Sequence, residues 1–211
     1  MIEQIKAVAR ECIRWLIRHD FRGVSRLRGA TDSWLAPAGG LERRAIGSCS
    51  ILLSHQHLAT RNMAYGAYEK HEIRAFERLL RPGDVVADVG ANVGYLTAHF
   101  SRIVGRSGRV FAFEPAPTPL LSLRQVASGC AFANIEVVPV AVSDRVGAAR
   151  YFETDVILSH GYGRIDERPS ERFSNVRESE VNTVSLDDFF LQSGRVLPRL
   201  VKLDVDGQER R

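Results

Sequence analysis

From about residue 68 onward, short apolar runs alternate with amphipathic segments. Runs at 84–89, 109–113, 135–138 and 200–205 predict buried strands. The segments between them carry apolar residues on one helical face, and Pro82-Gly83 ends the first of these predicted helices. This alternation predicts an α/β fold, with a doubly wound parallel sheet and helices on both of its faces.

The junction between the first strand and its helix carries the most chemical information. The segment Asp88–Gly94 places an acid at the strand end and glycines at Gly90 and Gly94, with Asn92 between them. Glycine turns let a ligand approach the backbone closely. A carboxylate there would repel a pyrophosphate but suits an ammonium or a sulfonium. We therefore predict that Asp88, Gly90, Asn92 and Gly94 bind S-adenosylmethionine.

A second acid, Glu114, follows the strand at 109–113 and precedes Pro115. A carboxylate in that position can accept hydrogen bonds from ribose hydroxyls, so Glu114 and Pro115 join the predicted cofactor site. One alternative is a βαβ unit with ordinary tight turns and two solvated acids. Another is a nicotinamide-dependent oxidoreductase, which is disfavoured because the turn lacks the Gly-x-Gly-x-x-Gly spacing.

The chain resembles the FkbM-type methyltransferases, which are class I enzymes that use S-adenosylmethionine, from about Tyr68 to Glu209. This resemblance implies a Rossmann-like class I methyltransferase fold. Pairing of a Leu-Asp-Asp segment with Lys-Leu-Asp-Val-Asp-Gly is its more family-specific part. The motifs that carry it are Tyr68-Glu69, Arg81–Asp84, Asp88–Gly94, Ala112–Pro115, Val140–Asp144, Ser185–Asp188 and Val201–Gly207.

The resemblance also implies roles for residues outside the glycine turn. It adds Glu69 to the cofactor site, and it implies that the segment around Val142, Ser143 and Asp144 lies against the adenine. The alternative for Ser143 and Asp144 is the start of a turn toward Gly147.

Asp204 is the predicted catalytic residue. It would lie at the carboxyl end of the strand at 200–205, beside the first strand, where ligands bind in such sheets. A hydroxyl acceptor must lose its proton, and a nearby carboxylate can take it. Asp204 could equally hold a loop or orient the amino group of the cofactor. In the family the acceptors are typically hydroxyls of small natural products or sugars, which favours O-methylation.

A long polar insertion, Glu153–Glu180, separates two short predicted strands. Inserted loops shape the acceptor pocket in methyltransferases of this type, so His160, Tyr162 and Arg164 are candidates for substrate contact. A solvated loop would have much the same composition.

Length and composition limit the remaining possibilities. The 211 residues fit an N-terminal helical and irregular appendage, 1–67, and a methyltransferase domain, 68–211. Neither a membrane span nor a secretory pattern is visible. The three cysteines suggest no disulfide and no metal site, and His55 and His57 lack a third ligand, so we expect no metal and a cytoplasmic location.

The basic charge is concentrated at the N-terminus. Residues 1–28 hold seven basic and three acidic side chains, which accounts for the whole net charge of +4. Lys6, Arg10, Arg14, Arg18 and Arg22 form a stripe on a predicted helix, beside an apolar face of Ile5, Val8, Ala9, Cys12 and Leu16.

We expect this helix to pack its apolar face on the catalytic domain and to leave its arginines in water. The alternative is a helix that lies on an anionic membrane surface or touches an acidic partner. Binding of nucleic acid is not expected, because no aromatic platform or reading motif accompanies the stripe.

The motifs stop early in the predicted sheet. A class I methyltransferase continues after the fourth core strand with a helix and three more strands, so we expect the C-terminal strands to be missing. The alternative function is therefore a truncated, non-catalytic remnant that binds cofactor or a partner without turnover.

Overall fold

The computed structural model describes residues 1–21, 23–153, 163–165 and 176–205. The chain divides into two compact units. Unit 1 contains residues 1–44 and 52–72, and unit 2 contains residues 45–51 and 73–211.

Unit 1 is mainly helical and includes most of a two-stranded hairpin. Its small core consists of Ile13 and Ile17 from the first helix together with Leu35 and Tyr65. The elements of this part of the chain are α1 (Ile2–Arg18), α2 (Val24–Leu35), η1 (Ala38–Gly40), β1 (Leu41–Ile46), β2 (Cys49–Ser54), α3 (Leu58–Tyr65) and α4 (Lys70–Leu79), of which the tip of the hairpin and most of α4, from Ile73 onward, belong to unit 2.

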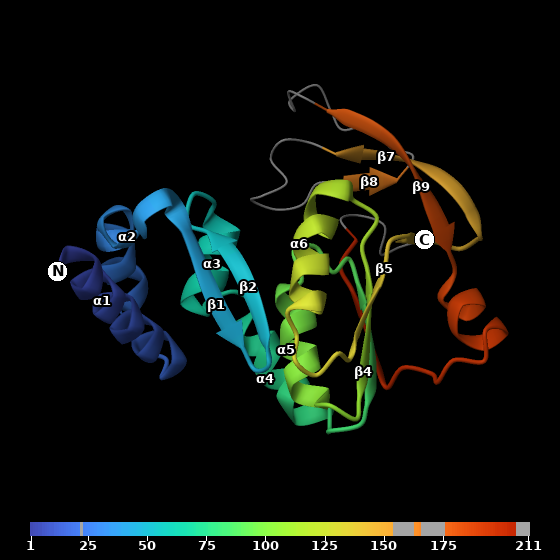
Figure 1. Cartoon of the computed structure of the whole chain (residues 1–211), viewed down its shortest axis with the longest axis horizontal. Coiled ribbons are helices and arrows are strands. Elements are labelled where there is room, and N and C mark those ends of the chain that lie inside the picture. The colour runs from blue at the N-terminus through green and yellow to red at the C-terminus, as the bar shows by residue number, and fades with distance from the viewer. Residues whose placement is uncertain (22, 154–162, 166–175, 206–211) are drawn as a thin grey trace. The chain divides into compact units, whose positions relative to one another are not determined.

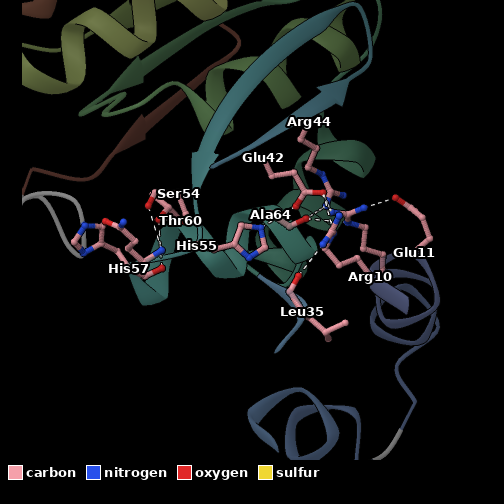
Figure 2. A network of polar contacts seen from close by, with 12 residues as sticks. Arg10, Glu11, Leu35, Glu42, Arg44, Ser54, His55, His57, Thr60 and Ala64 are labelled. Atoms are coloured by element: carbon pink, nitrogen blue, oxygen red, sulfur yellow. Dashed lines mark hydrogen bonds and ion pairs between the residues drawn. The ribbon is translucent and has the colours of Figure 1, made fainter. Parts of the chain in front are cut away.

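A polar network beside this core fixes how α1 faces the unit (Figure 2). Glu42 on β1 forms ion pairs with Arg14 and, at 3.7 Å, with Arg10, and its second oxygen lies 2.9 Å from His55 Nε2. Arg10 also donates to the Leu35 carbonyl at 2.7 Å. Arg10 and Arg14 of α1 therefore face inward, toward Glu42 and the Leu35 carbonyl.

The expectation that α1 leaves its arginines in water is wrong for Arg10, which is 7% exposed. Arg14 is likewise only partly exposed, whereas Ile5 and Val8, which we expected to be buried, are 53% and 63% exposed. The reason is a non-local partner: only the fold brings Glu42 next to α1, and a buried carboxylate must be paired.

Unit 2 contains a four-stranded parallel sheet in the order β10-β3-β4-β5 (Figure 1). In this order the last strand along the chain, β10, lies beside β3, as the sequence predicted, and Lys202 is in register with Asp88. The bounds of these strands are β3 (Val85–Val89), β4 (Arg109–Phe113), β5 (Ile135–Val138) and β10 (Leu200–Leu203).

Helices cover both faces of this sheet, which confirms the predicted α/β class. On one face, α6 (Pro117–Ser128) packs Leu120 and Leu123 against Ala112, next to α5 (Tyr95–Val104). On the other face, the π-helical turn η2 (Asp188–Gln192) places Phe189 and Phe190 against the aromatic residues of β4.

A second sheet follows β5 in the chain, with the strand order β6-β9-β7-β8. It comprises β6 (Ala141–Val142), β7 (Gly147–Glu153), β8 (Gly163–Ile165) and β9 (Arg177–Val184). The predicted insertion between two strands thus contains a further strand, β8, among the residues that the structure describes.

Two expectations about unit 2 need correction. We expected β10 to be covered on both faces, but Val201 and Leu203 are 40% and 54% exposed. We also expected no disulfide, yet Cys49 is bonded to Cys130, which lies 81 residues away in the sequence. Spacing could not reveal this pair, because only the fold brings the hairpin next to the end of α6. Within the described ranges, no helix is long and apolar enough to span a bilayer.

Candidate cofactor site at the carboxyl ends of β3, β4 and β10

Asp88 lies near the carboxyl end of β3 and is completely buried. Its Oδ2 accepts a hydrogen bond of 2.6 Å from the Thr97 hydroxyl on α5, and its Oδ1 lies 3.6 Å from Lys202 Nζ on β10. Burial raises the pKa of Asp88 above its ordinary value, and Lys202 and Thr97 oppose that rise. Among the described residues, no hydrogen-bond donor reaches Oδ1.

The glycine turn after β3 lies against the ends of both neighbouring strands, β4 and β10. Gly90 has φ +75°, and its N–H donates to the Phe113 carbonyl on β4 at 3.0 Å. A Cβ on Gly90 would lie 1.9 Å from the carbonyl oxygen of Asp204. Asn92 and Gly94 also adopt positive φ, +50° and +86°. Only glycine fits at position 90, because backbone from β10 fills the space that a side chain would need.

Glu114, directly after β4, is 5% exposed and organises the same turn. Its Oε2 accepts the N–H of Asn92 and its Oε1 accepts the N–H of Ala116, both at 2.8 Å. Burial raises the pKa of Glu114 to about 7, against the opposing effect of these two N–H donors. Pro115, the next residue, is half-buried. A carboxylate oxygen can accept more than one hydrogen bond, so Glu114 keeps capacity for a ligand.

Asp204 follows β10 and is half-exposed, at 50%. Its N–H donates to the Val89 carbonyl at 3.1 Å, which ties it to the end of β3. Its Oδ2 lies 3.4 Å from Lys202 Nζ. The structure therefore brings Asp204, Asp88 and the glycine turn together, as the sequence predicted for the ends of neighbouring parallel strands.

Lys202 is the residue of this site that reasoning from sequence missed. Its Nζ donates to the Gly90 carbonyl at 3.2 Å and lies between the carboxylates of Asp88 and Asp204. The signal was present, because a lysine inside the apolar run Leu200–Leu203 is unusual for a strand in a parallel sheet. Thr97, on the first full turn of α5, was missed as well.

The predicted adenine-side segment belongs to the second sheet. Val142 lies on β6, and its side chain packs against the aromatic core of the first sheet. Ser143 donates its N–H to the Val184 carbonyl and its hydroxyl to Asp144, which is exposed. These contacts with neighbouring residues agree with the turn interpretation, and a role at the adenine stays a prediction.

The other predicted residues belong to other elements or fall outside the described part of the chain. Glu69 belongs to unit 1, where it precedes α4 with φ +44° and is half-buried. Arg164 lies on β8, in register with Phe152. His160 and Tyr162 fall outside the described residues. Within the described ranges, no group of three potential ligands lies close enough to hold a metal ion.

The strand ends fit S-adenosylmethionine chemically. A buried Asp88 oxygen without a hydrogen-bond donor can accept one from an ammonium, and Glu114 can accept more from hydroxyls. Gly90 and Gly94 keep the backbone of the turn free of side chains at this point.

The model of the methyltransferase FkbM domain matches residues 88–211, more than half of the chain. The chain belongs to the FkbM methyltransferase family. The resemblance inferred from the sequence motifs is thereby confirmed, and so is the cofactor of the family, S-adenosylmethionine.

Among curated proteins, this FkbM-family chain is 33% identical over 155 residues to the 31-O-demethyl-FK506 methyltransferase FkbM of Streptomyces tacrolimicus. The match covers 63% of the chain but only 59% of that protein. A shorter match, 40% identical over 60 residues, joins it to ribosomal RNA large subunit methyltransferase E of Chromobacterium violaceum, covering 28% of this chain and 29% of that protein.

Solved structures similar to this FkbM-family chain include fibrillarin from Aeropyrum pernix in complex with S-adenosyl-L-methionine, at 25% identity and a TM-score of 0.30. That match covers 34% of this chain and 32% of the other. An O-methyltransferase dependent on S-adenosylmethionine, from Thermotoga maritima, matches with 24% identity and a TM-score of 0.32, covering 34% and 28%.

Proposed function

We propose that this chain binds S-adenosylmethionine at the carboxyl ends of β3, β4 and β10 and catalyses methyl transfer to a hydroxyl group of a small molecule. The observation that carries the proposal is the cluster at these ends: three acidic residues from adjacent strands and one lysine between two of them. The name of the relative from Streptomyces tacrolimicus indicates an O-methyltransferase, which supports a hydroxyl acceptor.

The cofactor supplies a methyl group already activated on a sulfonium, so the protein has mainly to position the acceptor and remove its proton. We assign binding to Asp88 and Glu114, the first through its oxygen without a donor and the second through hydrogen bonds from ribose hydroxyls. We assign a backbone role to Gly90, Asn92 and Gly94, whose turn conformation lets the main chain contact the ligand.

Asp204 is our candidate for the general base. It is the half-exposed carboxylate of the cluster, so an acceptor hydroxyl can reach it, whereas Asp88 and Glu114 are buried. Lys202 Nζ lies 3.4 Å from Asp204 Oδ2 and also donates to the Gly90 carbonyl. Lys202 therefore links Asp204 to the glycine turn. We retain Glu69, Pro115 and the segment Val142–Asp144 as further proposed cofactor contacts.

The first test is calorimetric titration of the chain with S-adenosylhomocysteine, repeated with Asp88→Asn and Glu114→Gln. We expect micromolar binding by the parent chain and at least about ten-fold weaker binding by each variant, because each loses a charged hydrogen-bond acceptor. A folded chain that does not bind S-adenosylhomocysteine would contradict the proposal.

Turnover is tested with tritium-labelled S-adenosylmethionine and a panel of polyhydroxylated small molecules. Asp204→Asn should retain S-adenosylhomocysteine binding within about three-fold while losing about a hundred-fold or more in methyl transfer, the usual share of a general base. Binding by the parent chain without transfer to any acceptor would favour the alternative, a cofactor-binding remnant.

We also propose a cytoplasmic location, and the bond between Cys49 and Cys130 offers its test. Disulfides persist in oxidising compartments and are rare in the cytoplasm. A cytoplasmic location therefore requires that this bond be reduced in the cell, so alkylation of thiols in intact cells, before lysis, should label both cysteines. Protection of both from alkylation would place the protein in an oxidising compartment.

A further inference from the structure

Helix α1 presents two apolar faces, and only one of them is covered. Ile13 and Ile17 are buried in the core of unit 1. A separate row of apolar side chains is directed to solvent, at a spacing of three or four residues that keeps it on one side of the helix. We call this row the α1 stripe; it consists of Ile2, Ile5, Val8, Cys12 and Trp15, with exposures of 63%, 53%, 63% and 58% for the four residues other than Cys12, which is also exposed.

The polar network of unit 1 keeps the α1 stripe outside. Arg10 and Arg14 reach from the other side of the helix to Glu42, and Arg14 also donates to the Ala64 carbonyl at 3.0 Å (Figure 2). Lys70 binds the Ile17 carbonyl and Asp20 at the end of α1. Turning α1 to cover its stripe would expose Ile13 and break these contacts, so the exposure of the stripe is built into the unit.

Exposed apolar rows of this length are unusual on a soluble surface and mark sites of association. The charge and the aromatic residues near the end of α1 indicate the partner. Residues 18–28 carry four arginines against the single acid Asp20, which is paired with Lys70. Arg18 and Arg26 are exposed, and so is Phe21, at 60%.

This combination of an apolar row, exposed aromatic residues near its end and adjacent arginines matches what an anionic lipid surface binds. Tryptophan favours the headgroup level, where its ring is half in hydrocarbon and half in water. We propose that the α1 stripe docks this protein on the surface of an anionic membrane, with α1 lying in the plane of the headgroups. Parallel pairing with a second copy of the chain would bring two arginine-rich segments together, which disfavours it. Antiparallel pairing is one of the outcomes that the test below distinguishes.

The test uses co-sedimentation of the full chain with vesicles of pure phosphatidylcholine and with vesicles of phosphatidylcholine mixed with the anionic lipid phosphatidylglycerol. We expect binding to the anionic vesicles only, and weaker binding as salt rises, because the arginine contribution is screened. The double variant Ile5→Ser/Val8→Ser should weaken binding at least about ten-fold, since two buried aliphatic side chains are lost.

A matched control removes two equally exposed apolar residues from unit 2. Leu121 and Val146 are 63% and 64% exposed, and Leu121→Ser/Val146→Ser should leave vesicle binding unchanged. Trp15 gives a direct readout, because the chain has only two tryptophans and Trp34→Phe leaves Trp15 as the sole tryptophan, which is excited selectively over the tyrosines. Its emission should shift to the blue on anionic vesicles, and lipids brominated near the headgroup should quench it.

Three results would overturn the proposal. One is a folded chain that binds no anionic vesicle. Another is binding that the Ile5→Ser/Val8→Ser variant retains in full. The third is a parent chain that sediments as a dimer without lipid and becomes monomeric in that variant, because the stripe would then bind a second copy. None of these results depends on methyl transfer, so the proposal stands apart from the proposed function.

Discussion

Unit 1 and unit 2 each shield a glutamate from solvent: Glu42 on β1 and Glu114 directly after β4. The pKa values of the two carboxyl groups shift in opposite directions. Burial by itself pushes the pKa of Glu42 upward, but hydrogen bonds from His55 and Arg14 outweigh it and lower the pKa to about 2. Burial raises the pKa of Glu114 to about 7, and two backbone N–H groups and the more distant charge of Lys202 oppose it there. The difference lies in the direct partners: Arg10, Arg14 and His55 contact Glu42, whereas among the described residues no basic side chain forms an ion pair with Glu114.

The residues around Glu42 and those at the strand ends of unit 2 are of similar types, but the two clusters differ in their role. Around Glu42 the cations exceed the acids, the network is closed by backbone carbonyls, and the result is structural. At the strand ends of unit 2, Asp88 and Asp204 share Lys202, Glu114 is held by two backbone N–H groups, and a buried oxygen of Asp88 has no hydrogen-bond donor among the described residues. Such a deficit of donors is expected where a ligand with cationic and hydroxyl groups binds.

The largest expected effect comes from a substitution that pushes the end of β10 away from the turn after β3. Gly90→Ala should destabilise unit 2 by about 4 kcal/mol, because its Cβ would collide with the Asp204 carbonyl and φ is +75°. Gly194→Ala is the matched control, since φ is +65° but nothing lies within 4 Å of its Cβ, and it should cost about 1 kcal/mol. Hydrogen exchange of β3 and β10 measures both, and equal losses in the two variants would argue against a close approach of β10.

Removing the carboxylate from the structural network should have the next largest effect. Glu42→Gln removes the anionic partner of Arg10 and His55 and leaves Arg14 paired with the exposed Glu11, so it should destabilise unit 1 by about 3 kcal/mol. Both tryptophans lie in unit 1, so urea unfolding followed by tryptophan fluorescence reports on this unit.

The same variant has a signature in pH. Because the pKa of Glu42 is lower in the folded state, its contribution is fully present above about pH 4.5 and is lost as the pH falls through about 2. The stability of the parent chain should fall in this pH range as Glu42 is protonated, and the variant should not show this loss. A variant as stable as the parent at pH 7 would mean that the network is not structural.

Lys202→Met should weaken binding of S-adenosylhomocysteine about thirty-fold, roughly 2 kcal/mol. The substitution removes the hydrogen bond to the Gly90 carbonyl and the cation beside Asp88 and Asp204. Arg109→Met is the control, because it removes a cation from an exposed pair with Glu136 at the amino end of β4, and calorimetry should show no change. Equal affinities for the two variants would remove Lys202 from the site.

The smallest expected effect is the pH dependence of ligand binding. Free Glu114 gains and loses a proton near pH 7, and its ionised form is the better acceptor for ribose hydroxyls. Affinity for S-adenosylhomocysteine should therefore rise about ten-fold between pH 6 and pH 8, and Glu114→Gln should abolish the rise. A flat profile in the parent chain would show that Glu114 does not contact the ligand.

Local patterns predicted the sheet of unit 2 well. The apolar runs ending at Asp88 and Glu114 became β3 and β4, and Asp204 was correctly placed at the end of β3's neighbour. These features are local in sequence or follow from general rules for parallel sheets, so they could be read without the fold.

Features that depend on distant partners could not be predicted. The inward turn of Arg10 depends on Glu42, the disulfide joins residues 81 positions apart, and Lys202 acquires its meaning from Asp88 across the sheet. In each case the chemistry of the residue was visible, but its partner was not.

The most direct test of the proposed site is the titration of Glu114 by carbon-13 NMR of its side-chain carboxyl, with and without S-adenosylhomocysteine, assigned with Glu114→Gln. The account predicts a pKa of about 7 in the free chain and a lower value in the complex, because hydroxyl donors favour the ionised form. A Glu114 carboxyl that titrates near its ordinary value, or one that the bound ligand leaves unchanged, would contradict the assignment of these strand ends as the cofactor site.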